Sequence, residues 1–320
     1  MKQSTKIAVL IAALCCFMGL ALITISLYMI EFDFTKLSTQ TYVEREYTLT
    51  DPFSAIQIDA VTSDVRFLPS ENDNCRVVCT EQEKMTHRIT AKDNTLTIRI
   101  DDQRSWYDHL GIFIGQSSSV TIYLPQLQYD QLEVRTDTGD LQIPSDFSFT
   151  STQIHTDTGD IKWAASGDSV VVDTDTGNVT LEGGQIQYLQ IETQTGNIRI
   201  GRTAFAIETD LHTDTGDIHL EEVTTHALQI VTHTGDVSLE NTVADGLLAI
   251  KTNTGDVEFN RFDAATLAIE TSTGDVTGTL LSPKMFLTHT NTGDVSVPQS
   301  YQGGICEITT DTGDIELSFA

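Results

Sequence analysis

Residues 228–240 read LQIVTHTGDVSLE, and close copies of this stretch recur between residues 129 and 320. The tetrapeptide T-x-T-G at its centre occurs ten times, with successive glycines 18–20 residues apart. So regular a period indicates one structural unit for each 19–20 residues. The ten glycines are Gly139, Gly159, Gly177, Gly196, Gly216, Gly235, Gly255, Gly274, Gly293 and Gly313.

Apolar and polar side chains alternate on both sides of each glycine. Five residues before the glycine the side chain is aliphatic in nine repeats, such as Val134 and Ile308, and Thr288 is the exception. Two residues after the glycine it is aliphatic in all ten, such as Leu141 and Ile315. A period of two predicts strands, so each unit is a strand, a Gly-Asp corner and a second strand.

A single unit of this kind cannot bury its own apolar face, whereas units stacked in register can. The repeats therefore predict an all-β fold, a single-stranded parallel β-solenoid of ten rungs, which we expect to coil right-handed. Glycine at the corner permits positive φ or a close approach of neighbouring rungs. The two threonine columns, which begin at Thr136 and Thr138, are predicted to point inward, with their hydroxyls hydrogen-bonded along ladders.

An uncharged apolar run occupies residues 7–30. As a helix with a rise of 1.5 Å per residue, it is long enough to cross a bilayer. Lys2 and Lys6 precede the run, which predicts that residues 1–6 are a cytoplasmic tail and that the rest of the chain is outside the cell.

Two other uses of an apolar N-terminus fit the sequence less well. The run is longer than the apolar core of a cleaved signal peptide and lacks a small-residue cleavage site. Leu14 before Cys15 does not match a lipoprotein signal, in which a small residue precedes the modified cysteine. We therefore expect a single-pass signal-anchor helix in the cell membrane.

Between the anchor and the repeats, residues 31–52 are expected to form a juxtamembrane segment and residues 53–128 an irregular β region. AVTSDVRF at 60–67 resembles a rung with Ser63 in the glycine place, and LTIRI (96–100) and VTIYLP (120–125) alternate like strands. We expect this region to cap one end of the solenoid that residues 129–320 form. The sequence assigns no role to the insert at 101–119.

Five cysteines give no disulfide framework and no zinc-binding spacing. Cys15 and Cys16 lie within the apolar run. Cys75 and Cys79, four residues apart on one predicted strand, are separated by about 13 Å, too far for a direct bond. Cys306 occupies an apolar column and is predicted to be a small core residue.

The chain is strongly acidic, with 46 Asp and Glu against 18 Lys and Arg and a formal net charge of −28. Residues 129–320 hold 31 of the acidic residues and only seven basic ones. This balance excludes a basic nucleic-acid groove. A hydrophobic content of 39% is sufficient for a buried core, so the acidity does not indicate disorder.

One N-terminal anchor, a strand region ending in VTIYLP and serial T-x-T-G-[DN] units resemble a bacterial family of membrane-anchored β-strand-repeat proteins. This family carries the label "putative adhesin", and the resemblance covers about residues 53–320. It implies the solenoid fold and a Gram-positive type of cell surface, and it supplies no catalytic residues.

The tripeptide Asp-Thr-Gly, at 137–139 and four further positions, is also the signature of aspartic proteases, in which two carboxylates share a proton. The same column holds Gln194, His233 and Asn253 in sister rungs, so it is predicted to be outward-facing and tolerant of substitution. A column of carboxylates along a rod does not supply one converging pair. We therefore expect no protease activity.

The residue after each glycine is Asp in eight repeats and Asn178 or Asn197 in the other two. Stacked carboxylates about 5 Å apart repel by about 0.8 kcal/mol in water, so an offsetting interaction is expected. Either each side chain accepts backbone N–H bonds at its own corner, which the two Asn favour, or divalent cations, Ca²⁺ first among them, bind along the column. This candidate Ca²⁺ ladder comprises Asp140, Asp160, Asp217, Asp236, Asp256, Asp275, Asp294 and Asp314, and no other cofactor is expected.

The sequence favours a non-enzymatic surface or envelope interaction module, with a cell-wall, host-surface or envelope-protein partner. An accessory or sensor protein of the envelope stress response is the alternative, and its short cytoplasmic tail would then need a membrane partner. A polysaccharide-active β-helix enzyme is a minor alternative, because the seven basic residues of the repeats are dispersed.

Overall fold

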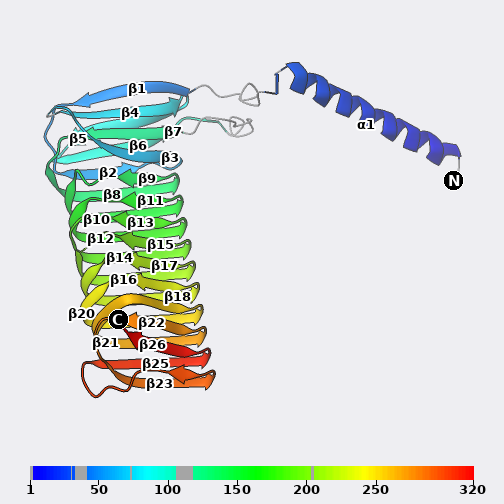
Figure 1. The fold of residues 1–320 in the computed structure, drawn as a ribbon. Helices are drawn as coiled ribbons and strands as arrows, with labels where there is room; N and C mark the ends of the chain where they lie inside the picture. Colours follow the sequence, from blue (N-terminus) through cyan, green and yellow to red (C-terminus); the bar gives the residue numbers. More distant parts are fainter. Residues whose placement is uncertain (1–2, 30, 33–41, 73, 106–117, 203–204) are drawn as a thin grey trace.

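The computed structural model describes residues 3–29, 31–32, 42–72, 74–105, 118–202 and 205–320, so most of the 101–119 insert lies outside the described residues. The N-terminal run forms one helix, α1 (Gln3–Met29), which projects away from the strands in Figure 1. Its segment Ile11–Met29 is long and apolar enough to cross a membrane by length and composition. The same properties fit a membrane anchor and a signal peptide.

The remaining strands form one stacked sheet that closes around an apolar interior (Figure 1). Each rung has a long strand before the glycine corner and a short one after it. The regular rungs are β8 (Gln128–Thr138) with β9 (Leu141–Ile143), β10 (Ser148–Thr158) with β11 (Ile161–Trp163), β12 (Ser166–Thr176) with β13 (Val179–Glu182), β14 (Ile186–Thr195) with β15 (Ile198–Gly201), β16 (Phe205–Thr215) with β17 (Ile218–Glu221), and β18 (Thr224–Thr234) with β19 (Val237–Glu240). They continue through β20 (Val243–Thr254), β21 (Val257–Thr273), which runs from one glycine corner to the next, and β22 (Val276–Leu280).

Neighbouring rungs pair in parallel and in register. Thr136 pairs with Thr156 across the long strands, and Ile161 pairs with Val179 across the short ones. Equivalent side chains therefore stack along the whole rod. The predicted parallel β-solenoid is confirmed.

The interior contains the apolar columns that the alternation predicts. Ile154 and Ile161, on either side of a corner, are both buried, and so are the larger Trp163 and Phe259. The first threonine column, from Thr136 to Thr310, is also buried in the described rungs except at Thr290.

The second threonine column was predicted to point inward, and this prediction is wrong. All ten of these residues, from Thr138 to Thr312, are exposed. Each is the last residue of its strand, and the chain already turns into the corner there, as the bond from Gly139 N–H to Thr158 O shows. The turn rotates the side chain out of the core face.

Both reasons for glycine at the corner operate together. The corner glycines have φ between +149° and +159°, a region that side-chain-bearing residues rarely adopt. A Cβ atom on Gly235 would lie 2.0 Å from the carbonyl oxygen of Gly216 in the adjacent rung. The register of the stack therefore depends on the missing side chain.

The last two rungs stack in the reverse of their chain order. β25 (Ile305–Thr312) and β26 (Ile315–Phe319) pair directly with β21 and β22. β23 (Met285–Thr292) and β24 (Val295–Ser296) pair with the other side of β25 and β26. The rung of Gly293 is therefore outermost, and Figure 1 shows β23 at the end of the stack, beyond β25.

Two sequence features explain this exchange of the last two rungs. The loop at 297–304, between β24 and β25, is the longest loop between two successive repeats, and it contains Gly303 with φ of +85°. It can therefore carry the chain back across one rung. Thr288, the one exception in the aliphatic column, lies in the outermost rung, where it is only half-buried.

The N-terminal region caps the opposite end with both parallel and antiparallel strands. β2 (Ala55–Asp59) and β3 (Ser63–Pro69) form a rung that stacks on β8 and β9, as the resemblance of residues 60–67 to a rung predicts. β6 (Thr95–Asp102) and β7 (Ser118–Leu124) stack in parallel on its outer side.

The outermost part of this cap is antiparallel. β4 (Cys75–Gln82) pairs with β7 and with β1 (Tyr42–Leu49), while β5 (Met85–Lys92) pairs with β6. β1 falls inside the expected juxtamembrane segment 31–52. It joins the cap because Tyr47 and Leu49 pack against the apolar core.

The cysteines lie where the sequence places them. Cys15 and Cys16 are exposed on α1, and all five cysteines are free. Cys306 is fully buried in its apolar column, as predicted.

Candidate functional site

The column of residues after each corner glycine forms a continuous hydrogen-bond ladder. The backbone N–H of Asp160 donates to Asp140 Oδ1 at 2.9 Å, and the N–H of Asp256 donates to Asp236 Oδ1 at 2.8 Å. The same bond joins every neighbouring pair in the stack, including the two Asn. It continues into the cap, where Asp140 N–H donates to Asp64 Oδ1 at 3.0 Å.

This geometry refines the turn-capping interpretation. Each side chain except that of Asp294, in the outermost rung, accepts a backbone N–H, as predicted, but from the neighbouring rung rather than from its own corner. An Asn oxygen makes the same bond, since Asn197 N–H donates to Asn178 Oδ1 at 3.0 Å. The bond therefore needs the side-chain oxygen and not the charge, and it offsets the repulsion between stacked carboxylates.

The candidate Ca²⁺ ladder remains a prediction. Among the described residues, two groups of at least three His, Cys, Asp or Glu have ligand atoms within 4.8 Å of one another, and neither contains a post-glycine Asp. The ladder Asp residues already use Oδ1 to accept a backbone N–H. A cation on this column would have to bind through the other carboxylate oxygen.

The hydroxyl-ladder prediction is wrong, because the buried threonines of the first T-x-T-G column do not hydrogen-bond to one another. Thr213 Oγ1 donates to Gly196 O at 3.1 Å, and Thr232 Oγ1 donates to Gly216 O at 3.3 Å, so the acceptor is the corner carbonyl of the neighbouring rung. Three members of the column, Thr156, Thr174 and Thr252, have a buried hydroxyl without a partner.

The exposed side of the corners forms an acidic ridge, which we define as three columns: the x residue and second Thr of T-x-T-G, and the Asp or Asn after the glycine. Nearly all members are exposed, and Asp160 and Asp175 are half-exposed. The x column contains the Asp-Thr-Gly carboxylates, and it is outward-facing as predicted. The ridge concentrates 13 of the 31 acidic residues of the repeats.

A polar cleft of about 510 Å³ lies at the cap end of the acidic ridge. Three ladder residues line it, Asp64, Asp140 and Asp160, together with Arg66 and Lys162. Hydroxyl and amide side chains complete the wall: Thr80, Ser119, Thr121 and Gln142. The cleft therefore presents both signs of charge where the rest of the ridge is acidic.

Exposed histidines form a second surface feature on neighbouring rungs. His233 Nδ1 lies 3.0 Å from Asp214 Oδ1, and His212 Nε2 lies 3.3 Å from the same oxygen. The two imidazole rings meet edge to face, with centroids 6.0 Å apart. His233 belongs to the x column that the sequence predicts to be outward-facing, and it is exposed, while His212 is half-exposed.

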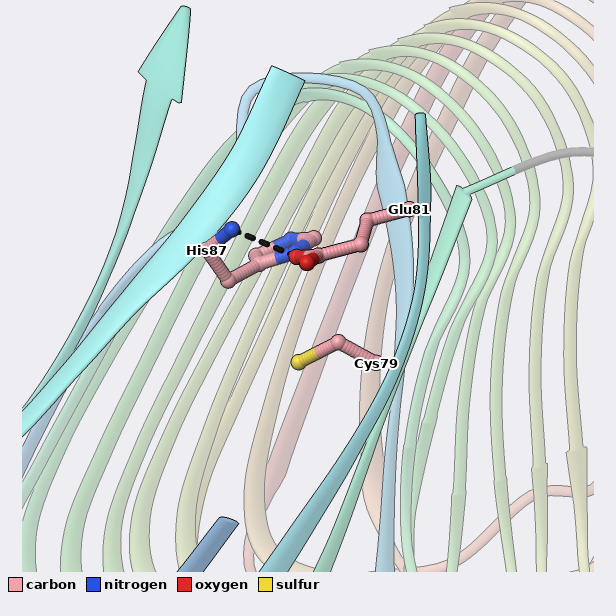
Figure 2. Close-up of side chains that lie close together, drawn as sticks. All are labelled: Cys79, Glu81 and His87. Atoms are coloured by element: carbon pink, nitrogen blue, oxygen red, sulfur yellow. Dashed lines mark hydrogen bonds and ion pairs between the residues drawn. The ribbon is translucent and has the colours of Figure 1, made fainter. Parts of the chain in front are cut away.

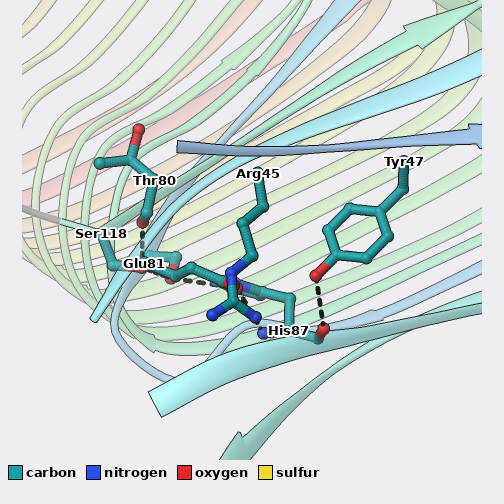
Figure 3. A network of polar contacts seen from close by, with 7 residues as sticks. Arg45, Tyr47, Thr80, Glu81, His87 and Ser118 are labelled. Atoms are coloured by element: carbon teal, nitrogen blue, oxygen red, sulfur yellow. Dashed lines mark hydrogen bonds and ion pairs between the residues drawn. The ribbon is translucent and has the colours of Figure 1, made fainter. Parts of the chain in front are cut away.

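A buried polar network joins five strands of the cap (Figure 3). Glu81 on β4 accepts the backbone N–H of His87 on β5 at 2.6 Å, and its Oε2 lies 3.0 Å from His87 Nδ1. Arg45 Nε on β1 lies 3.1 Å from Glu81 Oε1. Glu81 is 1% exposed and Arg45 is 45% exposed, so the pair connects the interior to the surface.

The network continues through two serines. Ser63 Oγ lies 3.4 Å from His87 Nε2 and donates to Ser118 Oγ at 2.7 Å, and Ser118 Oγ donates to Thr80 O at 3.0 Å. Ser63, His87 and Glu81 therefore have the connectivity of a Ser-His-Glu triad. Ser63 is fully buried and its proton is directed at Ser118, so this arrangement lacks both an accessible nucleophile and a base that receives its proton.

Burial controls the protonation of this region. It lowers the pKa of His87, against the opposing effect of the Glu81 carboxylate. It raises the pKa of the Cys79 thiol to about 12, with the charge of Glu81 as the second cause. At neutral pH the thiol is therefore protonated, unless a cation displaces the proton.

Sequence reasoning did not identify this cluster, although a signal was present. In CRVVCTEQ the inward positions are Cys75, Val77 and Cys79, and strict alternation places Glu81 on the same face. A carboxylate on an inward position of an otherwise apolar strand predicts a buried partner. The contribution of His87 from another strand depends on pairing that sequence alone does not specify.

The fold and the acidic ridge define an all-β repeat protein with one apolar N-terminal helix. The chain belongs to the Toastrack DUF4097 family, whose sequence model matches residues 53–247 and 242–320. This match confirms the resemblance found in the sequence, and its description names no enzymatic activity. No curated protein sequence matches the chain.

Solved structures with a related chain path share little sequence with this protein. A "putative adhesin" from Bacteroides fragilis covers 87% of this chain and 97% of its own, at 15% identity and a TM-score of 0.44. A "putative lipid binding protein" from Parabacteroides distasonis covers 88% and 98%, at 10% identity and a TM-score of 0.39. Similarities this low do not indicate what this chain binds.

Proposed function

We propose that the protein is a non-enzymatic interaction module, held at the cell membrane by α1, which displays its acidic solenoid outside the cell and binds a positively charged partner of the envelope through the acidic ridge. The observation that carries the proposal is the exposure of the ridge columns at fixed spacing along a stack of paired strands.

The ridge has two properties that favour recognition. Its carboxylates sit on paired strands and are held by the ladder bonds, so little side-chain entropy is lost on binding. Its charge of one sign attracts basic groups over a distance and speeds association. The mixed-charge cleft at its cap end supplies a site where a partner's orientation is fixed.

The position outside the cell rests on Lys2 and Lys6 before the apolar run, together with the length of α1. A cell-wall polymer with amino groups and a basic envelope protein both have the chemistry that the ridge recognises.

The test is binding of the full-length protein, in detergent, to isolated cell-wall and membrane fractions. In the ridge variant, Asp217, Asp236, Asp256 and Asp275 are replaced by Asn, which keeps the ladder bond, as Asn178 and Asn197 do. The expected result is a loss of about tenfold in binding, with an unchanged melting temperature.

The control variant removes the same charge elsewhere, with Gln at the exposed positions Glu182, Glu258, Glu307 and Glu316. Equal binding losses in the two variants would reduce the effect to net charge and contradict a specific ridge. If deletion of the gene impairs envelope-stress survival while no fraction binds the protein, the stress-accessory alternative replaces the proposal.

A further inference from the structure

We propose that Cys79, Glu81 and His87 bind one zinc ion, or a similar thiophilic divalent cation, inside the N-terminal cap. Their ligand atoms all lie within 4.8 Å of one another, and all three residues are buried. Figure 2 shows the Cys79 sulfur beside the Glu81 carboxylate and the His87 imidazole. We call these three residues the cap cluster.

The donor set selects the kind of cation. Sulfur, imidazole nitrogen and carboxylate oxygen together suit Zn²⁺, whereas Ca²⁺ and Mg²⁺ prefer oxygen alone. Zinc binds these donors at about 2.0–2.3 Å, so three ligand atoms around one ion lie about 3–4 Å apart. In the cap cluster Glu81 Oε2 lies 3.0 Å from His87 Nδ1, and all three ligand atoms lie within 4.8 Å of one another, which is close to that spacing.

Both ring nitrogens of His87 have a polar neighbour. Nδ1 lies 3.0 Å from Glu81 Oε2, and Nε2 lies 3.4 Å from Ser63 Oγ. A neutral imidazole carries one proton, which either nitrogen can hold. With that proton on Nε2, directed at Ser63, the Nδ1 lone pair and Glu81 Oε2 would be free to bind the same cation.

Glu81 gives a second, independent indication. Its Oε1 atom is buried and accepts no hydrogen bond, although it forms an ion pair with Arg45 Nε at 3.1 Å. A buried carboxylate oxygen without a hydrogen bond is costly, and coordination would satisfy it.

The charges also balance. A thiolate and a carboxylate together offset the charge of a divalent ion, and the thiol proton leaves to solvent on binding. Arg45 lies near the site, but it is half-exposed, so solvent screens its repulsion of the ion. The bond from His87 Nε2 to Ser63 has the form by which metal-binding histidines are held in place.

The probe is Co²⁺, which substitutes for zinc and gives a near-ultraviolet thiolate absorption band when sulfur is a ligand. The protein is the full-length chain in detergent, refolded with Co²⁺ because the site is buried. A background variant keeps Cys79 as its one thiol and removes the exposed histidine cluster, through C15A, C16A, C75A, C306V and H233N.

The expected result is about one cobalt per chain retained after gel filtration, with a thiolate band, and the same stoichiometry with zinc. The band must weaken at least about tenfold in Glu81→Gln, which keeps the side-chain shape but lacks the charge. A matched control is Glu222→Gln, on an exposed turn far from the cap in sequence.

Absence of the thiolate band in the background variant overturns the proposal, since Cys79 is its only sulfur ligand. Retention of cobalt without the band assigns the metal to the surface and overturns it equally. If the background variant fails to refold, the same band is measured in the wild-type chain with Cys79→Ser as its comparison, and equal bands in the two reject the cap cluster.

Discussion

The regular rungs between β8 and β22 and the two ends of the stack follow different rules. In the regular part, chain order and stacking order coincide, and each column repeats one side-chain type. At the ends they diverge: β6 and β7 lie outside β2 and β3, and β23 and β24 lie outside β25 and β26. The repeat therefore specifies how two rungs join, while loops and departures from the repeat decide which rungs meet.

The largest loss of stability is expected when a corner glycine of the regular rungs is replaced by a residue with a side chain. Gly235→Ala places a Cβ atom 2.0 Å from Gly216 O at φ of +151°, and rungs on both sides prevent relief. We expect a loss of about 3 kcal/mol or more in unfolding free energy, measured by urea denaturation followed by circular dichroism.

The same substitution in the outermost rung should lower the unfolding free energy less. Gly293→Ala creates a similar contact, 2.1 Å from Gly313 O, but its rung is outermost and can shift away. Gly201→Ala is the control, because no atom lies within 4 Å of the added Cβ. Equal losses at Gly235 and Gly293 would contradict the exchange of the last two rungs.

The next effect concerns Cys306, which the exchange places inside the stack. Burial raises the pKa of its thiol from about 9 to about 12. Above pH 9 the unfolded chain releases this proton while the folded chain keeps it, so stability falls as pH rises from 9 toward 12. At pH 10 this thiol accounts for about 1.4 kcal/mol of the loss.

The measurement compares the urea midpoints of the wild type and Cys306→Val at pH 8 and pH 10. Valine is chosen because the same column already contains a buried valine, Val170. The variant should lose less stability between the two pH values. An unchanged alkaline loss would show that the rung of Gly313 lies at the exposed end.

A smaller effect is expected in the ladder. Asp256→Ala removes the acceptor for the N–H of Asp275 and should cost about 1 kcal/mol, whereas Asp256→Asn keeps the bond and should be neutral. Asp294 is the last ladder member among the described residues, so Asp294→Ala should change the thermal melt little. A loss at Asp294 as large as at Asp256 would remove the distinction between interior and end.

The smallest predicted effect is a gain of stability, whereas Gly235→Ala and Asp256→Ala lower it. Thr252 has a buried hydroxyl without a partner, so Thr252→Val should raise the unfolding free energy by about 0.5 kcal/mol. Thr213→Val breaks the bond to Gly196 O and should lower it by a similar amount. Calorimetric melts of both variants test the sign, and destabilisation by Thr252→Val would show that its hydroxyl has a role in the stack.

Much of the fold follows from the sequence because one unit is repeated ten times. The strands, the corner, the buried apolar columns and the Ser63 rung are all predicted by period and alternation. The direction of the second threonine column was not, since it depends on where the strand ends relative to the turn. The ladder was anticipated as capping, but its acceptors bridge rungs, which only the stacked arrangement determines.

The cap cluster was not predictable as a unit. Glu81 can be recognised by its inward position, but the contact with His87 and Ser63 requires knowing that β4, β5 and β3 converge. The exchange of the last rungs is similar. Thr288 and the loop at 297–304 are the sequence features that accompany the exchange. Neither shows on its own which strand pairs with β21.

The inserted rung also sets an order for assembly. As the chain leaves the ribosome, residues 285–296 emerge before residues 305–319, but their own neighbour in the stack is the later segment. The earlier segment must therefore wait unpaired, or detach, until the later one takes its place against β21. The stack is complete only when residues 305–319 have been inserted between β21 and β23. The outermost rung can therefore reach its final place only after residue 319 has been synthesised.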